Sequence, residues 1–183
     1  YYAPWFRWIA ADSQAIDLHV IYASWPTPQQ QGVGFNREVA WDIPLIDGYS
    51  STIVRPARPS DRFDSQHFRG LDVPDVRQAL VNARPDVVVV FGWYSITLVR
   101  AIRAARSLKV PVLYHGDTNL QSAPLGWRRP LWFAKTRWLL SRFNGYLSVG
   151  VRSAAFLRFF GVPDERIFAT PHAVENSRFA GAS

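Results

Sequence analysis

Two polar side chains that could act on a hydroxyl group lie two positions apart, at His115 and Asp117. They follow an apolar run over residues 109–114 that predicts a buried strand, so both can project from one strand end, with Asn119 in the same loop as a further binding group. A neutral imidazole can bind or deprotonate a hydroxyl, and a carboxylate can hold a pair of hydroxyls. The alternative is a structural histidine, satisfied by backbone groups, beside a capping aspartate.

Two other short segments carry groups that could bind a ligand. Trp93 and Tyr94 could stack on a sugar face, although aromatic residues at strand ends are also common as lids over a core. Arg152 and Ser153 open a predicted helix after Gly150, and a helix N-terminus that carries an arginine suits a phosphate group. Ordinary helix capping explains the same residues equally well, so both interpretations stay open.

The elements that would position these groups are predicted from residues 84–117. Residues 87–91 form an uninterrupted β-branched and aromatic run, which predicts a strand buried on both faces, at or near the centre of a sheet. Ser95 can cap a helix with apolar residues at helical spacing, and residues 109–114 then form a second strand. Strand, helix and strand in this order imply parallel pairing with a right-handed crossover. The loops after both strands should therefore share one rim, where ligands bind in open parallel sheets.

The rest of the chain continues this alternation of helices and strands. A helix is expected to begin near Pro4, and the further predicted helices cover residues 72–83, 127–143 and 151–160. The further predicted strands cover residues 16–23, 39–45, 146–149 and 166–169, with loops over residues 24–37 and 55–69. The expected fold is α/β and Rossmann-like, with a doubly wound, mainly parallel sheet.

Composition narrows the class of protein. The 183 residues suit one domain, and the hydrophobic content of 48% and aromatic content of 15% argue against disorder. The chain has no cysteine, which excludes disulfides, thiolate metal sites and cysteine catalysis. No apolar run is long enough for a transmembrane helix, and the N-terminus lacks the apolar stretch of a signal peptide. The chain also has no methionine, so we expect that Tyr1 is not its natural start.

The common catalytic motifs are missing or incomplete. Gly32 and Gly34 begin a dinucleotide-binding fingerprint, but the third glycine is absent. Neither a phosphate-binding loop with its lysine nor a nucleophile elbow is present. The four histidines have no metal-ligand spacing, so we expect no metal site; they are His19, His67, His115 and His172.

The chain is strongly basic, with a formal net charge of +7 and a pI of about 10.2. This charge permits an anionic partner such as a nucleotide sugar, a phospholipid surface or nucleic acid, or it reflects arginines that solvate helix faces. Within the helix predicted for residues 127–143, three basic residues recur at heptad spacing beside bulky apolar ones. The basic residues are Arg128, Lys135 and Arg142, and the apolar ones are Trp127, Trp138 and Leu139. Such a stripe suits a membrane interface, although a helix packed between sheet and neighbours explains it as well.

The carboxyl-terminal motifs resemble a known family. They are PDVVVVFGWYS at residues 85–95, VPVLYHGDTN at 110–119, RFNGYLSVG at 142–150 and VRSAAFLRFFGVPDERIFATPHAVEN at 151–176. The last stretch is the most specific, because GVP at 161–163 leads to RI at 166–167 and then to PHAVEN at 171–176. With these motifs the chain resembles the N-terminal half of a family 4 (group 1) glycosyltransferase with the GT-B fold, most strongly from residue 85 onward.

This resemblance implies a domain organisation. Residues 1–176 would be the N-terminal, acceptor-binding Rossmann-like domain, without the first strand and glycine-rich loop that the family has. Residues 177–183 would begin a linker to a C-terminal donor-binding domain that this chain lacks. In the family, transfer needs no metal or other cofactor and usually retains the anomeric configuration. The chain alone should therefore transfer no sugar, because the leaving phosphate is stabilised largely by the missing domain.

The resemblance also implies a function and site. The parent enzyme would move a hexosyl group from a nucleotide sugar to a saccharide or lipid-linked acceptor, for bacterial cell-envelope polysaccharide, in the cytoplasm or at the inner membrane. Its partners would not include nucleic acid. His115 would be the catalytic residue, at least partly exposed at the rim, and the segment from Gly150 to Ser153 would face the cleft. His115→Ala should then lower kcat/KM by roughly 10²-fold while leaving the melting temperature nearly unchanged.

Two other classes of function fit the same residues. One is a non-catalytic Rossmann-like module that binds a carbohydrate or an anion. The other is a peripheral membrane module that uses the tryptophan- and arginine-rich helix over residues 127–143.

Overall fold

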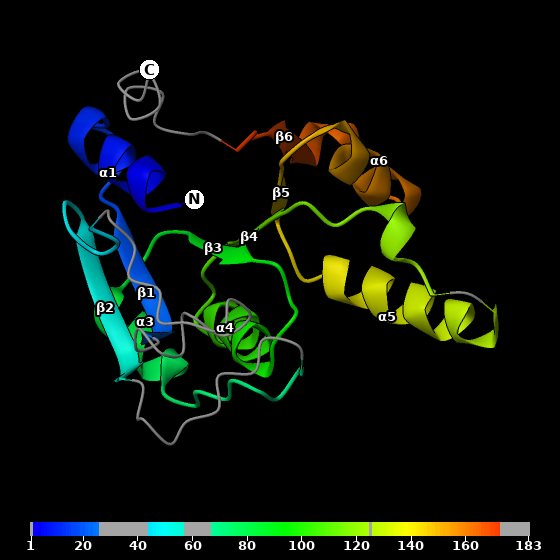
Figure 1. The fold of residues 1–183 in the computed structure, drawn as a ribbon, viewed down its shortest axis with the longest axis horizontal. Coiled ribbons are helices and arrows are strands. Elements are labelled where there is room, and N and C mark those ends of the chain that lie inside the picture. The colour runs from blue at the N-terminus through cyan, green and yellow to red at the C-terminus, as the bar shows by residue number, and fades with distance from the viewer. Residues whose placement is uncertain (1, 26–43, 57–66, 125, 173–183) are drawn as a thin grey trace, which may run out of the picture. The chain divides into compact units, whose positions relative to one another are not determined.

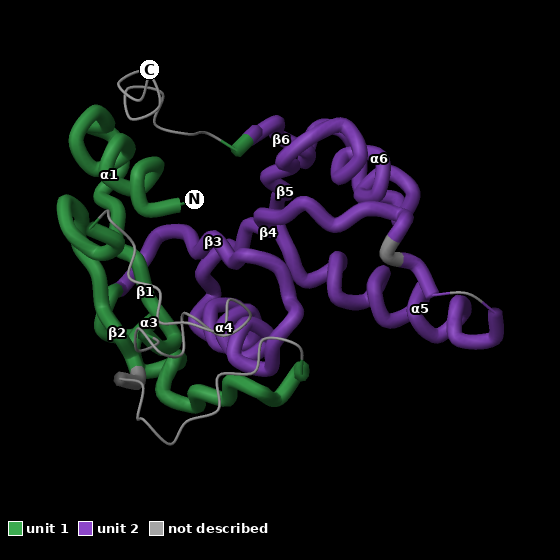
Figure 2. Tube along the Cα trace, in the orientation of Figure 1, with its two compact units in different colours: residues 1–83, 172–183 green, residues 84–171 purple. Residues whose placement is uncertain are grey.

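The computed structural model describes residues 2–25, 44–56, 67–124 and 126–172 of the chain. These residues fall into two compact units, which Figure 2 distinguishes by colour. Unit 1 comprises residues 1–83 together with residues 172–183, and unit 2 comprises residues 84–171. The predicted strand at 39–45 falls almost entirely outside the described residues, as does the predicted linker at 177–183.

Unit 1 is built on two parallel strands. Its elements are α1 (Tyr2–Asp12), β1 (His19–Trp25), β2 (Ser50–Pro56) and α3 (Val76–Ala83). Strands β1 and β2 pair in parallel, with Tyr22 opposite Ile53, and α3 contacts both strands (Figure 1). The sequence analysis missed β2: it assigned no element to residues 50–54 and began the predicted 55–69 loop at residue 55, whereas the strand continues to Pro56.

A cluster of aromatic residues connects α1 to β1 and to the segment before β2 in unit 1. Phe6 is buried and meets Tyr49 edge to face, with ring centroids 5.4 Å apart. The hydroxyls of Tyr49 and Tyr22 are 2.6 Å apart, and the Tyr49 hydroxyl also donates to the Leu45 carbonyl. Burial raises the pKa of Tyr22, and its hydrogen bond to Tyr49 raises that pKa further, so the Tyr22 hydroxyl keeps its proton at physiological pH.

Unit 2 is a parallel α/β unit, as the sequence predicted. Its strands are β3 (Val88–Phe91), β4 (Val112–Gly116), β5 (Gly145–Ser148) and β6 (Ile167–Ala169), paired in the order β3-β4-β5-β6. The connecting helices are α4 (Ile96–Ser107), α5 (Arg129–Leu140) and α6 (Val151–Phe159). Three short 3₁₀ helices complete it: η1 (Leu120–Ser122), η2 (Gly126–Arg128) and η3 (Asp164–Arg166).

Strand β3 is not where the sequence analysis expected it. We predicted that residues 87–91 would be central and buried on both faces, but β3 is an edge strand of the four-stranded sheet. Val90 is 3% exposed, whereas the adjacent Val89 is 38% exposed and Val87 is 46% exposed. An uninterrupted apolar run is compatible with one covered face or two, because the pattern does not report what lies above each face.

Local sequence signals explain the ends of the helices in unit 2. The Ser95 side chain caps α4 by accepting from the Leu98 N–H at 3.4 Å. Gly161 follows α6 with φ of +82°, a left-handed conformation that glycine adopts without steric cost, as its position after the helix predicted. Asn144 precedes β5, and its side-chain oxygen accepts from the Val112 N–H at 2.9 Å, which links the start of β4 to the α5–β5 turn.

Candidate functional site

Three loops of unit 2 open at one edge of the four-stranded sheet. They follow the carboxyl ends of β3, β4 and β5, at residues 92–95, 117–119 and 149–150. The three strands are parallel neighbours, so their carboxyl ends lie along the same edge (Figure 1). The residues that the sequence analysis proposed for catalysis and substrate binding lie in or beside these loops, which we call the rim.

His115 lies in β4 itself and not in the loop that follows it. It is paired in register with Phe91 on β3 and Leu147 on β5, and its ring centroid is 5.0 Å from that of Phe91. Only 3% of the residue is exposed, so the expectation of a partly exposed histidine is wrong. We expected His115 and Asp117 to project together from the end of a strand. Strand β4 extends through Gly116, however, so the His115 imidazole lies within the sheet and only Asp117 lies in the loop.

Trp93 and Tyr94 are adjacent but have different surroundings. The Trp93 ring lies 5.0 Å from Tyr114 and 6.3 Å from Phe143, so it packs onto the aromatic core as a lid. Tyr94 is 66% exposed. Of the two aromatic residues expected to stack on a ligand, only Tyr94 therefore presents its ring to solvent.

The loop after β4 supplies one exposed carboxylate. Asp117 is exposed, whereas the Asn119 side chain accepts from the Gln121 N–H at 2.9 Å and caps η1. The Tyr114 hydroxyl donates to Thr118 at 3.1 Å and shapes the start of the loop. Gly116 is required there, because a Cβ at this position would overlap the Tyr114 ring and hydroxyl.

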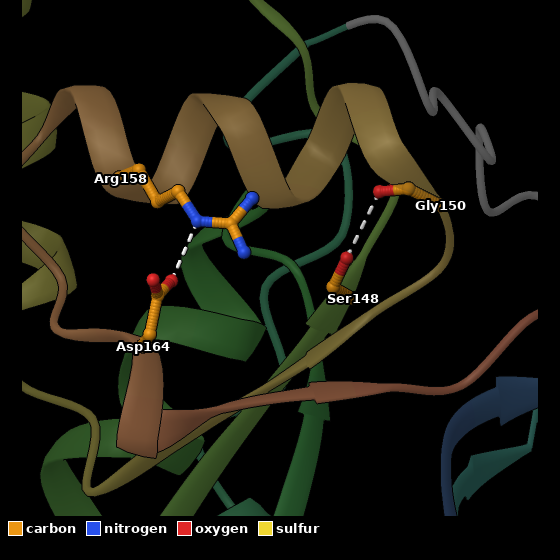
Figure 3. A network of polar contacts seen from close by, with 4 residues as sticks. All are labelled: Ser148, Gly150, Arg158 and Asp164. Carbon is orange, nitrogen blue, oxygen red and sulfur yellow. Dashed lines mark hydrogen bonds and ion pairs between the residues drawn. The ribbon is translucent and has the colours of Figure 1, made fainter.

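The loop between β5 and α6 is held by a serine pair. Ser148 and Ser153 are both 3% exposed, and their hydroxyl oxygens are 3.0 Å apart. The Gly150 N–H donates to Ser153 at 3.1 Å. Ser148 donates to the Gly150 carbonyl at 3.0 Å, and Figure 3 shows this bond. Ser153 is therefore occupied as a cap, which favours the capping interpretation for this residue.

Arg152 occupies the adjoining position in the first turn of α6, and its side chain is exposed. The space beside Gly150 is open, because a Cβ placed on it would meet nothing within 4 Å. An exposed guanidinium beside an open helix N-terminus is an arrangement that attracts anions. The rim therefore has three exposed groups: Tyr94 and Asp117 from two strand-end loops, and Arg152 from the first turn of α6.

Ser148 is the rim residue that the sequence analysis missed. Its hydroxyl contacts Gly150 and Ser153, and its carbonyl accepts from the Thr170 N–H at 2.8 Å, which ties the end of β6 to the same loop. A serine at the end of an apolar strand and two residues before a glycine is the signal that could have identified it.

At the other end of α6, Arg158 and Asp164 form an ion pair of 2.5 Å, also visible in Figure 3. Both side chains are more than half exposed, so solvent screens the pair and it contributes little to stability.

The exposed rim groups are of types that can hydrogen-bond a hydroxyl group or attract an anion. No group of three or more histidine, cysteine or acidic side chains close enough to hold a metal ion occurs among the residues that the structure describes. In the same part of the chain, no helix is both long and apolar enough to cross a bilayer.

A parallel α/β unit whose strand-end loops carry exposed polar groups defines a Rossmann-like binding unit. A comparison with protein-family models finds a match over residues 27–173 to the family described as the glycosyl transferase 4-like domain. A search of curated proteins finds no match. The family match covers most of the chain, so the chain belongs to the glycosyl transferase 4-like domain family. It is a glycosyltransferase-type module, and this class of protein acts on a saccharide-type acceptor.

Proposed function

We propose that this chain is the acceptor-binding part of a glycosyltransferase that moves a hexosyl group from a nucleotide sugar to a saccharide or lipid-linked acceptor. The observation that carries this proposal is the rim of a chain of this family, where Tyr94 and Asp117 are exposed on two strand-end loops and Arg152 is exposed in the first turn of α6. Residues 1–176 would form the acceptor domain, and residues 177–183 would begin the linker to a donor-binding domain. Synthesis of a bacterial cell-envelope polysaccharide, in the cytoplasm or at the inner membrane, is the cellular role that this proposal favours.

Each exposed rim group has a part in this proposal. The Tyr94 ring stacks on the acceptor sugar, and the Asp117 carboxylate accepts hydrogen bonds from a pair of its hydroxyls. Arg152, at the N-terminal end of α6, stabilises a phosphate oxygen of the donor or of a lipid-linked acceptor. Trp93, Asn119 and Ser153 support the rim without direct contact, because their side chains are packed or hydrogen-bonded within unit 2.

The transfer step breaks one bond at the anomeric carbon and forms one. The bond between the anomeric carbon and the donor phosphate oxygen breaks, and its electron pair leaves with the nucleotide phosphate. A bond forms between the anomeric carbon and the acceptor oxygen, and the hydroxyl proton passes to a base. We propose that the step needs no bound metal or other cofactor, so a chelator should leave the turnover of the parent enzyme unchanged.

His115 remains a candidate for this chemistry, but its burial changes the expected mode of action. An imidazole that is 3% exposed beneath the rim can act on an acceptor hydroxyl only if the rim loops open, or it positions the β4 loop that carries Asp117. The two possibilities differ in their pH profile, because only a proton-transferring imidazole adds an ionisation near its own pKa to kcat/KM.

The test uses the parent enzyme with its donor-binding domain, assayed for sugar transfer from a panel of nucleotide sugars. Tyr94→Ala and Asp117→Asn should each raise KM for the acceptor by about tenfold or more, because each removes a contact of 1–3 kcal/mol typical magnitude. Trp8→Ala and Asp75→Asn are matched controls at exposed positions of unit 1 and should leave both constants unchanged. Equal effects of the rim and control variants would refute the assignment of the rim.

A non-catalytic module that binds a carbohydrate or an anion is a second candidate. The burial of His115 favours it, because Asp117 is then the one exposed carboxyl or imidazole group among the described residues of the three rim loops. Saccharide binding at the rim, together with no transfer by the parent chain from any donor, would establish this candidate in place of the enzyme.

A further inference from the structure

A groove between α4 and α5 is lined by three arginines and four apolar or aromatic residues. Its volume is about 180 Å³. The arginines are Arg103, Arg106 and Arg142, and the other residues that line it are Val99, Ile102, Trp138 and Leu139. None of these seven lining residues is acidic, so the groove has no carboxylate of its own to balance three positive charges. It lies entirely within unit 2: six of its lining residues belong to the helices labelled α4 and α5 in Figure 1, and Arg142 lies just after α5.

Two of the three guanidinium groups, those of Arg106 and Arg142, make contacts with groups that carry no negative charge. Arg106 donates to the Arg142 carbonyl at 3.0 Å, which links α4 to the end of α5. The Arg142 guanidinium carbon lies 4.4 Å from the Trp138 ring centroid, in a cation–π contact. The Arg142 Nε atom is buried, and within the described chain no atom accepts a hydrogen bond from it. A donor in that state stabilises an anionic oxygen that enters the groove.

The surface beside the groove is apolar and exposed. Trp138 lines the groove and is 46% exposed, and Leu131, two helical turns earlier on the same face of α5, is 70% exposed. Trp127, just before α5 in η2, is 80% exposed, with the Arg128 guanidinium 5.4 Å from its ring centroid. Tryptophan and leucine side chains that flank arginines are typical of a protein face that enters a bilayer interface.

We propose that this face of unit 2 docks on an anionic phospholipid bilayer. The groove between α4 and α5 takes a lipid phosphate group, and Trp127, Leu131 and Trp138 enter the interface beside it. Charge complementarity identifies the occupant, because an anionic headgroup matches the three arginines and the adjoining acyl region matches the exposed apolar side chains. Leu131 favours a lipid over a nucleic acid, since an aliphatic side chain provides no stacking surface for a base. The proposal does not depend on sugar transfer.

The experiment is flotation of the full chain with two kinds of vesicle, pure phosphatidylcholine and phosphatidylcholine mixed with phosphatidylglycerol. We expect binding to the anionic vesicles, loss of that binding at high salt, and little binding to the neutral ones. Equal binding to both kinds, or to neither, would overturn the proposal.

Paired variants separate a site from net charge. Arg103→Gln combined with Arg106→Gln should weaken binding by about fivefold for each arginine removed. Arg69→Gln combined with Arg77→Gln removes the same charge from exposed positions in unit 1 and should have a much smaller effect. Equal effects of the two pairs would show that net charge alone drives binding and would refute the groove. Arg103→Gln alone, which keeps the Arg106 hydrogen bond, provides the same comparison if the double variant does not fold.

A second pair of variants tests the apolar part of the surface. Trp127→Ser combined with Leu131→Ser should lower vesicle binding severalfold without changing the melting temperature, because both side chains are mostly exposed. Trp8→Ser combined with Ile16→Ser, at positions that are 62% and 55% exposed, is the matched control. Inorganic phosphate or single-stranded DNA that displaced the chain from vesicles at low concentration would instead assign the groove to a soluble anion or to nucleic acid, and would overturn the bilayer assignment.

Discussion

The two faces of the four-stranded sheet in unit 2 differ in what covers them. One face carries Val90, Val112, Tyr114 and Tyr146, which are all at most 4% exposed, and the Tyr146 hydroxyl reaches the Leu140 carbonyl of α5 at 2.6 Å. The opposite face carries Val89 and Phe168, which are 38% and 53% exposed. We call these the helix-covered face and the opposite face. An apolar strand can therefore be buried on one side and partly exposed on the other, although parallel sheets usually have both faces covered.

The largest difference between the faces should appear with two phenylalanines. Phe156 of α6, in the helix layer, packs against the rings of Trp132 and Phe160 and is 1% exposed, so Phe156→Ala should lower the free energy of unfolding by about 3–5 kcal/mol. Phe168→Ala, on the opposite face, should cost less than about 1 kcal/mol, because half of that side chain is already in water. Urea denaturation of both variants measures the two values, and similar losses would contradict the comparison.

His115 tests whether the opposite face is uniformly open. It is on the same face as Val89 by register, yet it is 3% exposed beside Phe91. His115→Ala should therefore lower the free energy of unfolding by about 2 kcal/mol or more, in contrast to the unchanged melting temperature expected from sequence. Thermal unfolding and the kcat/KM of the parent enzyme should be measured together. A 10²-fold loss of kcat/KM with an unchanged melting temperature would restore the purely catalytic interpretation.

Two adjacent valines in β3, Val89 and Val90, allow the same substitution to be compared on the two faces of the sheet. Val90→Ala should cost about 1–2 kcal/mol, since it removes buried methyl groups from the helix-covered face. Val89→Ala should cost at most about half as much, because its side chain is 38% exposed. Both residues are valines in the same strand, so the change in β-sheet propensity is the same for the two variants. The difference between their free energies of unfolding therefore reports burial alone. If Val89→Ala were the more destabilising of the two, the opposite face would be the better packed one.

The Tyr146 hydroxyl, on the helix-covered face, gives an effect on stability that depends on pH. Tyr146→Phe removes the hydrogen bond to Leu140 and should cost about 1 kcal/mol at neutral pH. Burial raises the pKa of Tyr146 in the folded chain, and Arg166 opposes this shift. Above a pH of about 10 the unfolded chain ionises this tyrosine first, so the wild-type chain loses stability as pH rises. The phenylalanine variant lacks that loss, so the gap between the two should narrow in alkaline urea titrations, and a widening gap would contradict the burial of this hydroxyl.

The elements of unit 2 were predictable because their signals are local. Three short patterns each mark an element boundary within a few residues. They are Ser95 before an apolar helical pattern, Asn144 and Gly145 after another such pattern, and Gly161 followed by Pro163. The parallel pairing followed from the strand–helix–strand order, since a crossover of that length cannot form a hairpin. The strand β2 was missed because its local signal is weak: its first residues, Ser50 and Ser51, are also common in turns.

The rim was predictable as a location but not in its details. Parallel strand ends must meet at one edge, so Tyr94, Asp117 and Arg152 were correctly assigned to it. The packing of Trp93 against Tyr114 was not predictable, because it depends on the rotamer and on residues from another strand. The groove of Arg103, Arg106 and Arg142 was likewise invisible, since its two sides are separated by more than thirty residues.

The amino-acid sequence by itself determined the family, the strand–helix alternation of unit 2 and the edge of the sheet that carries polar loops. These properties depend on side-chain type and on short spacings, which are complete in the linear chain. Tertiary structure alone decided that β3 is an edge strand, that His115 is buried while Tyr94 is exposed, and that three arginines share one groove. Burial and charge clustering are sums over neighbours that are distant in sequence, so no local pattern contains them.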